Sequence, residues 1–146
     1  MAEVAWFRYQ PGTEIYFIKE PLRSMRKRIL IADDNPGILE VVSIILESEG
    51  YEVKSTADPQ HVLQVKEDPP GLILLDIWMG GTDGRHICKQ LKADHLTSHI
   101  PVILMSANSD IRAIAAESGA DGFIAKPFEI DDLINQIQSV YASGNS

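Results

Sequence analysis

The chain has 146 residues, 45% of them hydrophobic, and a formal net charge of −8. This length suits one domain with one sizeable core, and the balance of apolar and charged residues excludes a largely disordered chain. The negative charge disfavours non-specific binding to nucleic acid or to acidic membranes. The apolar runs are too short to span a bilayer, and the lone Cys88 cannot form an internal disulfide, which is typical of the cytoplasm.

The charge is distributed unevenly along the chain. Residues 1–28 carry a net charge of +3, whereas residues 29–146 carry −11. We therefore place a boundary near Met25 and interpret residues 1–24 as an N-terminal extension, either an extended start or a non-native addition. The stretch GTEIYFIKEP within it is typical of a short strand. Residues 25–142 form the predicted domain, and residues 143–146 a frayed tail.

Beyond Lys27, short apolar runs alternate with segments of helical periodicity. In chain order, the sequence predicts a strand at 28–33, a helix at 36–50, a strand at 51–56, a helix at 58–68, a strand at 71–77, a helix at 83–94, a strand at 100–107, a helix at 110–120, a strand at 121–127 and a helix at 129–142. Asn35 is the expected N-cap of the first helix, with Pro36 in its first turn, and Gly119 is expected to end the fourth.

This alternation predicts an α/β fold, a doubly wound five-stranded parallel sheet with helices on both faces. The first, third and fourth strands are nearly continuous apolar runs, as expected at the centre of such a sheet. The second strand carries Glu52, Lys54 and Thr56 and is typical of an edge. The most economical strand order is 2-1-3-4-5, the flavodoxin-like arrangement, with a crevice at the carboxyl ends of strands one and three.

Polar residues stand where four of these strands end. Asp33 and Asp34 end the first strand, Asp76 the third, Ser106 the fourth and Lys126 the fifth. Each has an ordinary explanation by itself: acids near a helix start, a residue opening a glycine-rich turn, a serine bonding its own backbone, an exposed lysine. Their convergence at one edge of the sheet instead predicts a functional site.

The chemistry of this set is that of a phosphate acceptor. Three carboxylates in one crevice repel each other unless a cation joins them, and oxygen ligands favour Mg²⁺. A carboxylate such as Asp76 can act as a nucleophile and form an aspartyl phosphate. Lys126 would supply positive charge to the transferred group, and Ser106 a hydroxyl donor.

The segments ILIADDN, LILLDIWMGGTDG, VILMSA and GFIAKPF together resemble the receiver domain of two-component response regulators, over about residues 27–142. The resemblance implies that Asp76 is the phosphoacceptor and that Asp33 and Asp34, with Asp76 and the backbone carbonyl of Trp78, hold Mg²⁺. It also implies that Lys126 binds the phosphoryl group and precedes a cis peptide bond to Pro127.

The resemblance further implies a switch. Ser106 and Phe123 occupy the hydroxyl and aromatic switch positions, so phosphorylation would draw the hydroxyl inward, let Phe123 turn in and alter the surface of the fourth helix, fifth strand and fifth helix. Gly80 stands where the family usually has a proline, which predicts a looser loop around Trp78. Trp78 and Asn108 occupy positions that influence dephosphorylation in the family.

Several interpretations remain open at this point. The first is a signalling module that receives a phosphoryl group from a histidine kinase or a histidine phosphotransfer protein and binds a downstream protein. It would catalyse only its own phosphorylation and hydrolysis, and it would bind neither nucleic acid nor a membrane. Whether it forms a homodimer stays open.

The alternatives are a degenerate receiver that acts by binding alone and a Mg²⁺-dependent phosphatase of the haloacid dehalogenase type. The phosphatase would need an Asp-x-Asp motif after the first strand, which DDNPG does not provide. A flavin-binding protein would need a phosphate-binding loop there, which two aspartates would oppose.

Overall fold

The computed structural model of the chain describes residues 28–144. Its central parallel sheet has the order β2 (Glu52–Thr56), β1 (Arg28–Ala32), β3 (Leu72–Asp76), β6 (Val102–Ser106) and β7 (Gly122–Ala125). This is the predicted order, because the sequence analysis numbered β6 and β7 as the fourth and fifth strands. The predicted extension, 1–24, and its short strand lie outside the described residues.

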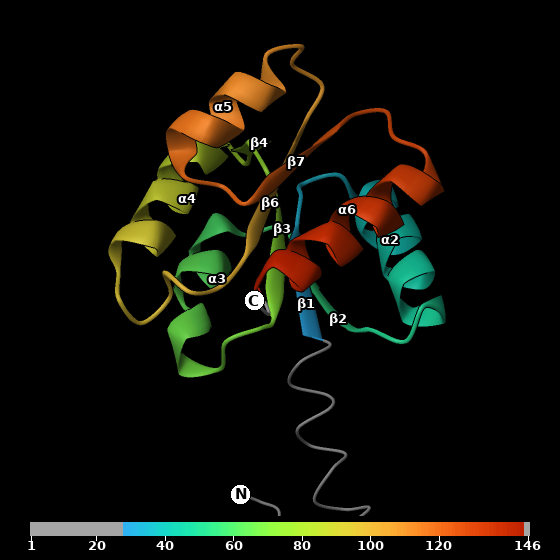
Figure 1. Ribbon diagram of the computed structural model, residues 1–146, viewed down its shortest axis with the longest axis horizontal. Helices are drawn as coiled ribbons and strands as arrows, with labels where there is room; N and C mark the ends of the chain where they lie inside the picture. Colours follow the sequence, from blue (N-terminus) through green and yellow to red (C-terminus); the bar gives the residue numbers. More distant parts are fainter. Residues whose placement is uncertain (1–27, 145–146) are drawn as a thin grey trace, which may run out of the picture.

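Helices cover both faces of the sheet (Figure 1). One layer contains α3 (Pro59–Leu63), α4 (Gly84–Ala93) and α5 (Ile111–Ser118), and the other contains α2 (Pro36–Ser48) and α6 (Ile130–Gly144). Successive side chains of a strand point to opposite faces, so each central strand supplies both cores. In β3, Ile73 and Leu75 pack with the α3–α5 layer, whereas Leu72 and Leu74 pack with the α2–α6 layer.

Capping residues set the helix ends that position the crevice. The side chain of Asn35 accepts hydrogen bonds from the backbone N–H groups of Gly37 and Ile38, which confirms it as the N-cap of α2. Gly119 ends α5 with φ at 79°, the left-handed conformation that glycine adopts without steric cost. At the other end of the chain, α6 continues through Gly144 and so includes the first residues of the predicted tail.

The segment predicted as a helix at 58–68 is broken in two. α3 ends at Leu63, and a 3₁₀ turn, η2 (Val65–Glu67), follows it. Val62 and Val65 are both buried in the same core cluster. The chain therefore still buries one valine from each of the two short helices, although the α-helical winding stops at Leu63. Among the described residues, no helix combines the length and apolar character needed to cross a bilayer.

A small hairpin follows β3, which the sequence analysis did not predict. Its strands are β4 (Trp78–Met79) and β5 (Thr82–Asp83), paired antiparallel. The two linking residues, Gly80 and Gly81, have φ of 56° and 78°. Two-residue hairpin turns of this kind need positive φ at both positions, which a glycine pair supplies. The predicted loop is therefore a two-residue hairpin turn beside the carboxyl end of β3.

Candidate functional site

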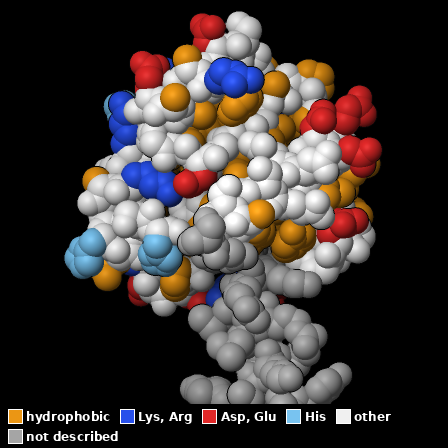
Figure 2. Space-filling model, viewed as in Figure 1, with side chains coloured by type: hydrophobic (Ala, Val, Ile, Leu, Met, Phe, Trp, Pro, Cys, Tyr) orange, Lys and Arg blue, Asp and Glu red, His pale blue; other side chains and the backbone are white. Residues whose placement is uncertain are grey.

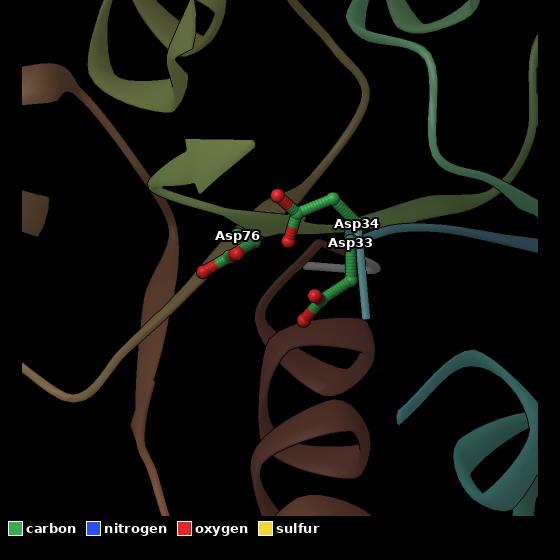
Figure 3. A group of neighbouring side chains, drawn as sticks. All are labelled: Asp33, Asp34 and Asp76. Carbon is green, nitrogen blue, oxygen red and sulfur yellow. The ribbon is translucent and has the colours of Figure 1, made fainter. Parts of the chain in front are cut away.

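The acids predicted at the strand ends converge on one point. Asp33 directly follows β1, Asp34 comes next, and Asp76 is the last residue of β3. Their carboxylates point toward a common space (Figure 3), and each offers an oxygen within 4.8 Å of the others. Asp33 is fully buried and Asp76 is 8% exposed, whereas Asp34 is open to solvent. Three negative charges thus share a site that water only partly screens.

Lys126 brings the neutralising charge from the opposite side of the crevice. It follows β7, and its ammonium nitrogen lies 2.6 Å from Asp33 Oδ2 and 3.4 Å from Asp76 Oδ1. The peptide bond from Lys126 to Pro127 is cis, as the resemblance implied. One lysine against three carboxylates leaves two formal negative charges without a partner in this cluster.

Backbone groups hold the acid pair in place. Asn35 donates its N–H to Asp33 Oδ1 at 3.0 Å, while Lys126 occupies Oδ2, so both oxygens of the buried Asp33 are satisfied. Asp34 accepts a hydrogen bond of 3.2 Å from the backbone N–H of Gly80. The glycine turn of the hairpin is therefore tied directly to the second acid of the pair.

The electrostatics single out Asp76. Burial raises the pKa of its carboxyl above the ordinary value, and the negative charge of Asp33 raises it further. Lys126 opposes both effects without cancelling them. The raised pKa means that the ionised form of Asp76 lacks the positive charge or the donors that would stabilise it. A cation bound beside Asp76 would lower this pKa.

A cavity of about 420 Å³ opens beside Asp76. The cavity is lined by four further residues of the predicted site, which are Trp78, Ser106, Asn108 and Lys126. Trp78 is 60% exposed, so a large aromatic surface stands next to Asp76. Ser106 is buried, and its hydroxyl oxygen accepts a hydrogen bond of 2.9 Å from the backbone N–H of Asn108. The predicted nucleophile, hydroxyl and lysine therefore face one space of molecular size.

Phe123, the predicted aromatic switch residue, lies elsewhere. It is in β7 and is partly buried against the core of the α3–α5 layer. Its side chain is not among those that line the cavity beside Asp76. In the register of the sheet, Phe123 stands opposite Leu104, two residues before Ser106.

Two features of the site were missed by the sequence analysis. The tie between Gly80 and Asp34 depends on the hairpin, for which the dipeptide Gly80-Gly81 was the available signal. Gly84 at the start of α4 is required by close packing, because a Cβ there would meet the backbone of Asp76 and lie 2.8 Å from Ile77 Cα. Any larger residue would displace the strand end that carries Asp76.

Comparison with known families separates the receiver interpretations from the other interpretations left open by the sequence. Residues 29–138 match the model of the response regulator receiver domain. The chain belongs to this family. The match favours the receiver interpretation over the phosphatase and flavin-binding alternatives, and the strand order agrees with it.

Relatives of this receiver chain include longer regulators. The DNA-binding response regulator MtrA of Mycolicibacterium smegmatis is 34% identical over 119 residues, which cover 80% of this chain and 51% of that protein. The phosphate regulon transcriptional regulatory protein PhoB of Pseudomonas aeruginosa is 38% identical over 117 residues, covering 78% of this chain and 51% of that protein. The chain therefore spans about half the length of these curated relatives.

Solved receiver structures agree with the fold along nearly their whole length. A CheY-like receiver domain protein from Methanospirillum hungatei has a TM-score of 0.74 and 30% identity, covering 82% of this chain and 96% of that one. The receiver domain of a sensor histidine kinase from Pseudomonas aeruginosa, solved with magnesium in its active-site cleft, has a TM-score of 0.71 and 28% identity, covering 80% and 98%.

Proposed function

We propose that this receiver chain is a phosphoacceptor module and that Asp76 takes the phosphoryl group. One observation carries the proposal: the Asp76 carboxylate lies 3.4 Å from the ammonium of Lys126, in a cavity shared with the Ser106 hydroxyl and beside two further acids. A nucleophile, a cation and a hydroxyl are the groups that phosphoryl transfer to a carboxylate requires.

The transfer itself exchanges one bond for another. A carboxylate oxygen of Asp76 attacks the phosphorus of a phosphohistidine on a histidine kinase or a histidine phosphotransfer protein. The new O–P bond forms as the N–P bond breaks, and the electron pair stays on the imidazole nitrogen, which then takes up a proton. Lys126 pairs with the phosphoryl oxygens, and Ser106 donates its hydroxyl to one of them. The module transforms only itself and has no separate substrate.

The donor set of the site fits Mg²⁺. Asp33, Asp34 and Asp76 offer only oxygen ligands, which hard cations prefer, and Lys126 balances only one of their three charges. These three residues would hold the ion together with the backbone carbonyl of Trp78. When bound, Mg²⁺ supplies positive charge that keeps Asp76 ionised and attracts an anionic phosphodonor.

The phosphorylated module would signal through the surface around Phe123. A phosphoryl group on Asp76 attracts the Ser106 hydroxyl, Phe123 turns into the space behind it, and the surface of α5, β7 and α6 changes for a downstream protein. Exposed acids gather where α6 begins (Figure 2): Glu129, Asp131 and Asp132. A related regulator is named as DNA-binding, so the absence of nucleic-acid binding by this chain stays a prediction from its charge. Its cytoplasmic location likewise stays a prediction, from its single cysteine.

A chemical trap tests the assignment of the phosphorylated residue. The full chain is incubated with phosphoramidate and Mg²⁺, then treated with hydroxylamine, which converts an acyl phosphate to a hydroxamate on the same side chain. Peptide mass mapping should place the hydroxamate on Asp76. A hydroxamate on Asp33 or Asp34 instead, or phosphate retained on a histidine, would contradict the proposal.

A further inference from the structure

Phe123 has a cationic partner on the neighbouring helix. The guanidinium carbon of Arg112, in the first turn of α5, lies over the Phe123 ring, 5.3 Å from its centroid. Arg112 is exposed to solvent, whereas Phe123 is partly buried. At this distance the cation is attracted to the negative face of the ring. The contact therefore joins α5 to β7 at the residue that the proposed function makes mobile.

The backbone of Phe123 is held from the other side. Its N–H donates to Gln136 Oε1, in α6, at 3.0 Å. The neighbouring Gly122 leaves room for that amide, because a Cβ at Gly122 would lie 3.2 Å from the Gln136 carboxamide carbon. The two helices thus hold different parts of one residue, since α6 holds the backbone of Phe123 and α5 holds its ring.

The ring lies outside the cavity into which it would turn. The cavity beside Asp76 is lined near the switch serine by Ser106, Ala107 and Ile114. Phe123 lines a different hollow, on the α6 side, with Pro127 and Gln136. A phenylalanine has no hydroxyl with which to bond either position, so the contact with Arg112 is a specific attraction on its ring that packing alone does not supply.

We propose that Arg112 is a positioning residue, which holds the Phe123 ring outside the Ser106 cavity and so opposes the switch. This inference rests on the proposed function and adds a residue to its regulation. When the ring turns inward, the guanidinium loses its partner and is released onto the surface of α5, β7 and α6. An exposed cation–π contact shifts such an equilibrium by about two- to fivefold. Removal of Arg112 should raise the inward population of the ring by that factor.

The first test needs no phosphorylation. The unphosphorylated full chain carries ring-labelled phenylalanine, and the NMR signal of Phe123 is assigned by its loss in Phe123→Leu. In Arg112→Gln, which removes the charge but keeps a polar side chain, the Phe123 signal should shift and its nuclear Overhauser contact with the Ala107 methyl should grow. Lys66→Gln, which removes one positive charge from η2, is the matched control and should leave both unchanged.

A second readout links the ring to the chemistry. With phosphoramidate and Mg²⁺, Arg112→Gln should be phosphorylated about two to five times faster than the wild type and Lys66→Gln. An unchanged Phe123 signal, or an equal shift in Lys66→Gln, would overturn the inference. So would a shifted ring in a chain whose phosphorylation rate is unaltered. If the wild type accepts no phosphate, the proposed function fails, while the ring contacts in the unphosphorylated chain still decide whether Arg112 positions Phe123.

Discussion

The ammonium of Lys126 lies 2.6 Å from a carboxylate oxygen of Asp33, although 93 positions separate the two residues in the chain. The pair connects the ends of β1 and β7, across the two strands that stand between them in the sheet. Asp33 is fully buried, so this contact compensates a charge that water does not reach. Lys126 therefore stabilises the crevice before any phosphoryl group is present.

Removal of Lys126 should leave Asp33 as an unpaired buried charge. In the absence of divalent cations we expect Lys126→Met to lose about 3 kcal/mol of unfolding free energy at neutral pH, measured by urea denaturation. The double variant Lys126→Met/Asp33→Asn should recover most of that loss, because the charge is then gone as well. Equal stability of the single and double variants would show that the pair does not carry this role.

The raised pKa of Asp76 predicts how stability changes with pH. Below the ordinary carboxyl pKa, Asp76 is protonated in both the folded and the unfolded chain and has no effect. As the pH rises through that value and then through the higher folded pKa, Asp76 ionises in both states. The ionised carboxylate destabilises only the folded state, where it is buried and poorly compensated, so the unfolding free energy falls.

Asp76→Asn removes this charge and isolates its effect. Without divalent cations, we expect the variant to be as stable as the wild type near pH 3 and more stable near pH 7, as measured by urea denaturation across that range. A stability difference that stays constant with pH, or a more stable wild type at pH 7, would contradict the raised pKa.

Mg²⁺ should stabilise the chain by binding the folded acid cluster. At a concentration one hundred times its dissociation constant, a ligand specific for the folded state adds about 2.7 kcal/mol. The thermal midpoint of the wild type should rise with Mg²⁺ and return when the ion is chelated. Asp34→Asn should lose most of this response, whereas Glu40→Gln, which removes an exposed acid from α2, should keep it. The same shift in both variants would mean non-specific binding.

Proline, which the family usually has at the position of Gly80, should destabilise the hairpin turn of this chain. Gly80 has a φ of 56°, which proline cannot adopt, and its N–H donates to Asp34. Gly80→Pro should therefore destabilise the chain by about 1–3 kcal/mol and weaken Mg²⁺ binding, because the turn and the tie to Asp34 are both lost. Gly81→Asn is the control, since asparagine tolerates positive φ. A Gly80→Pro chain with unchanged stability and Mg²⁺ response would show that the turn is not needed.

Much of this molecule could be predicted from local patterns. Apolar runs and helical periodicity gave the strands and helices, and Asn35 gave the start of α2, because these features are encoded by neighbouring residues. The strand order then followed from the most economical arrangement of such a sheet. Parallel strands end at a common edge, so the positions of Asp33, Asp76, Ser106 and Lys126 along the chain placed them together before any geometry was known.

The remaining features depend on contacts between distant segments. Lys126 lies nearer to Asp33 than to Asp76 because of side-chain geometry across the sheet. The spacing of these residues in the sequence does not reveal this preference. The contact between Arg112 and Phe123 depends on how α5 packs beside β7. The change from α3 to a 3₁₀ turn at Val65 interrupts a segment whose sequence pattern predicted one continuous helix.

The central claim is that Asp76 accepts a phosphoryl group in a reaction that needs Mg²⁺. The most direct measurement is the intact mass of the full chain after incubation with phosphoramidate, with Mg²⁺ or with a chelator, beside Asp76→Asn. We predict one added phosphoryl group in the wild type with Mg²⁺, and none in the chelated sample or the variant. No addition to the wild type at any Mg²⁺ concentration, or an equal addition to Asp76→Asn, would contradict the account.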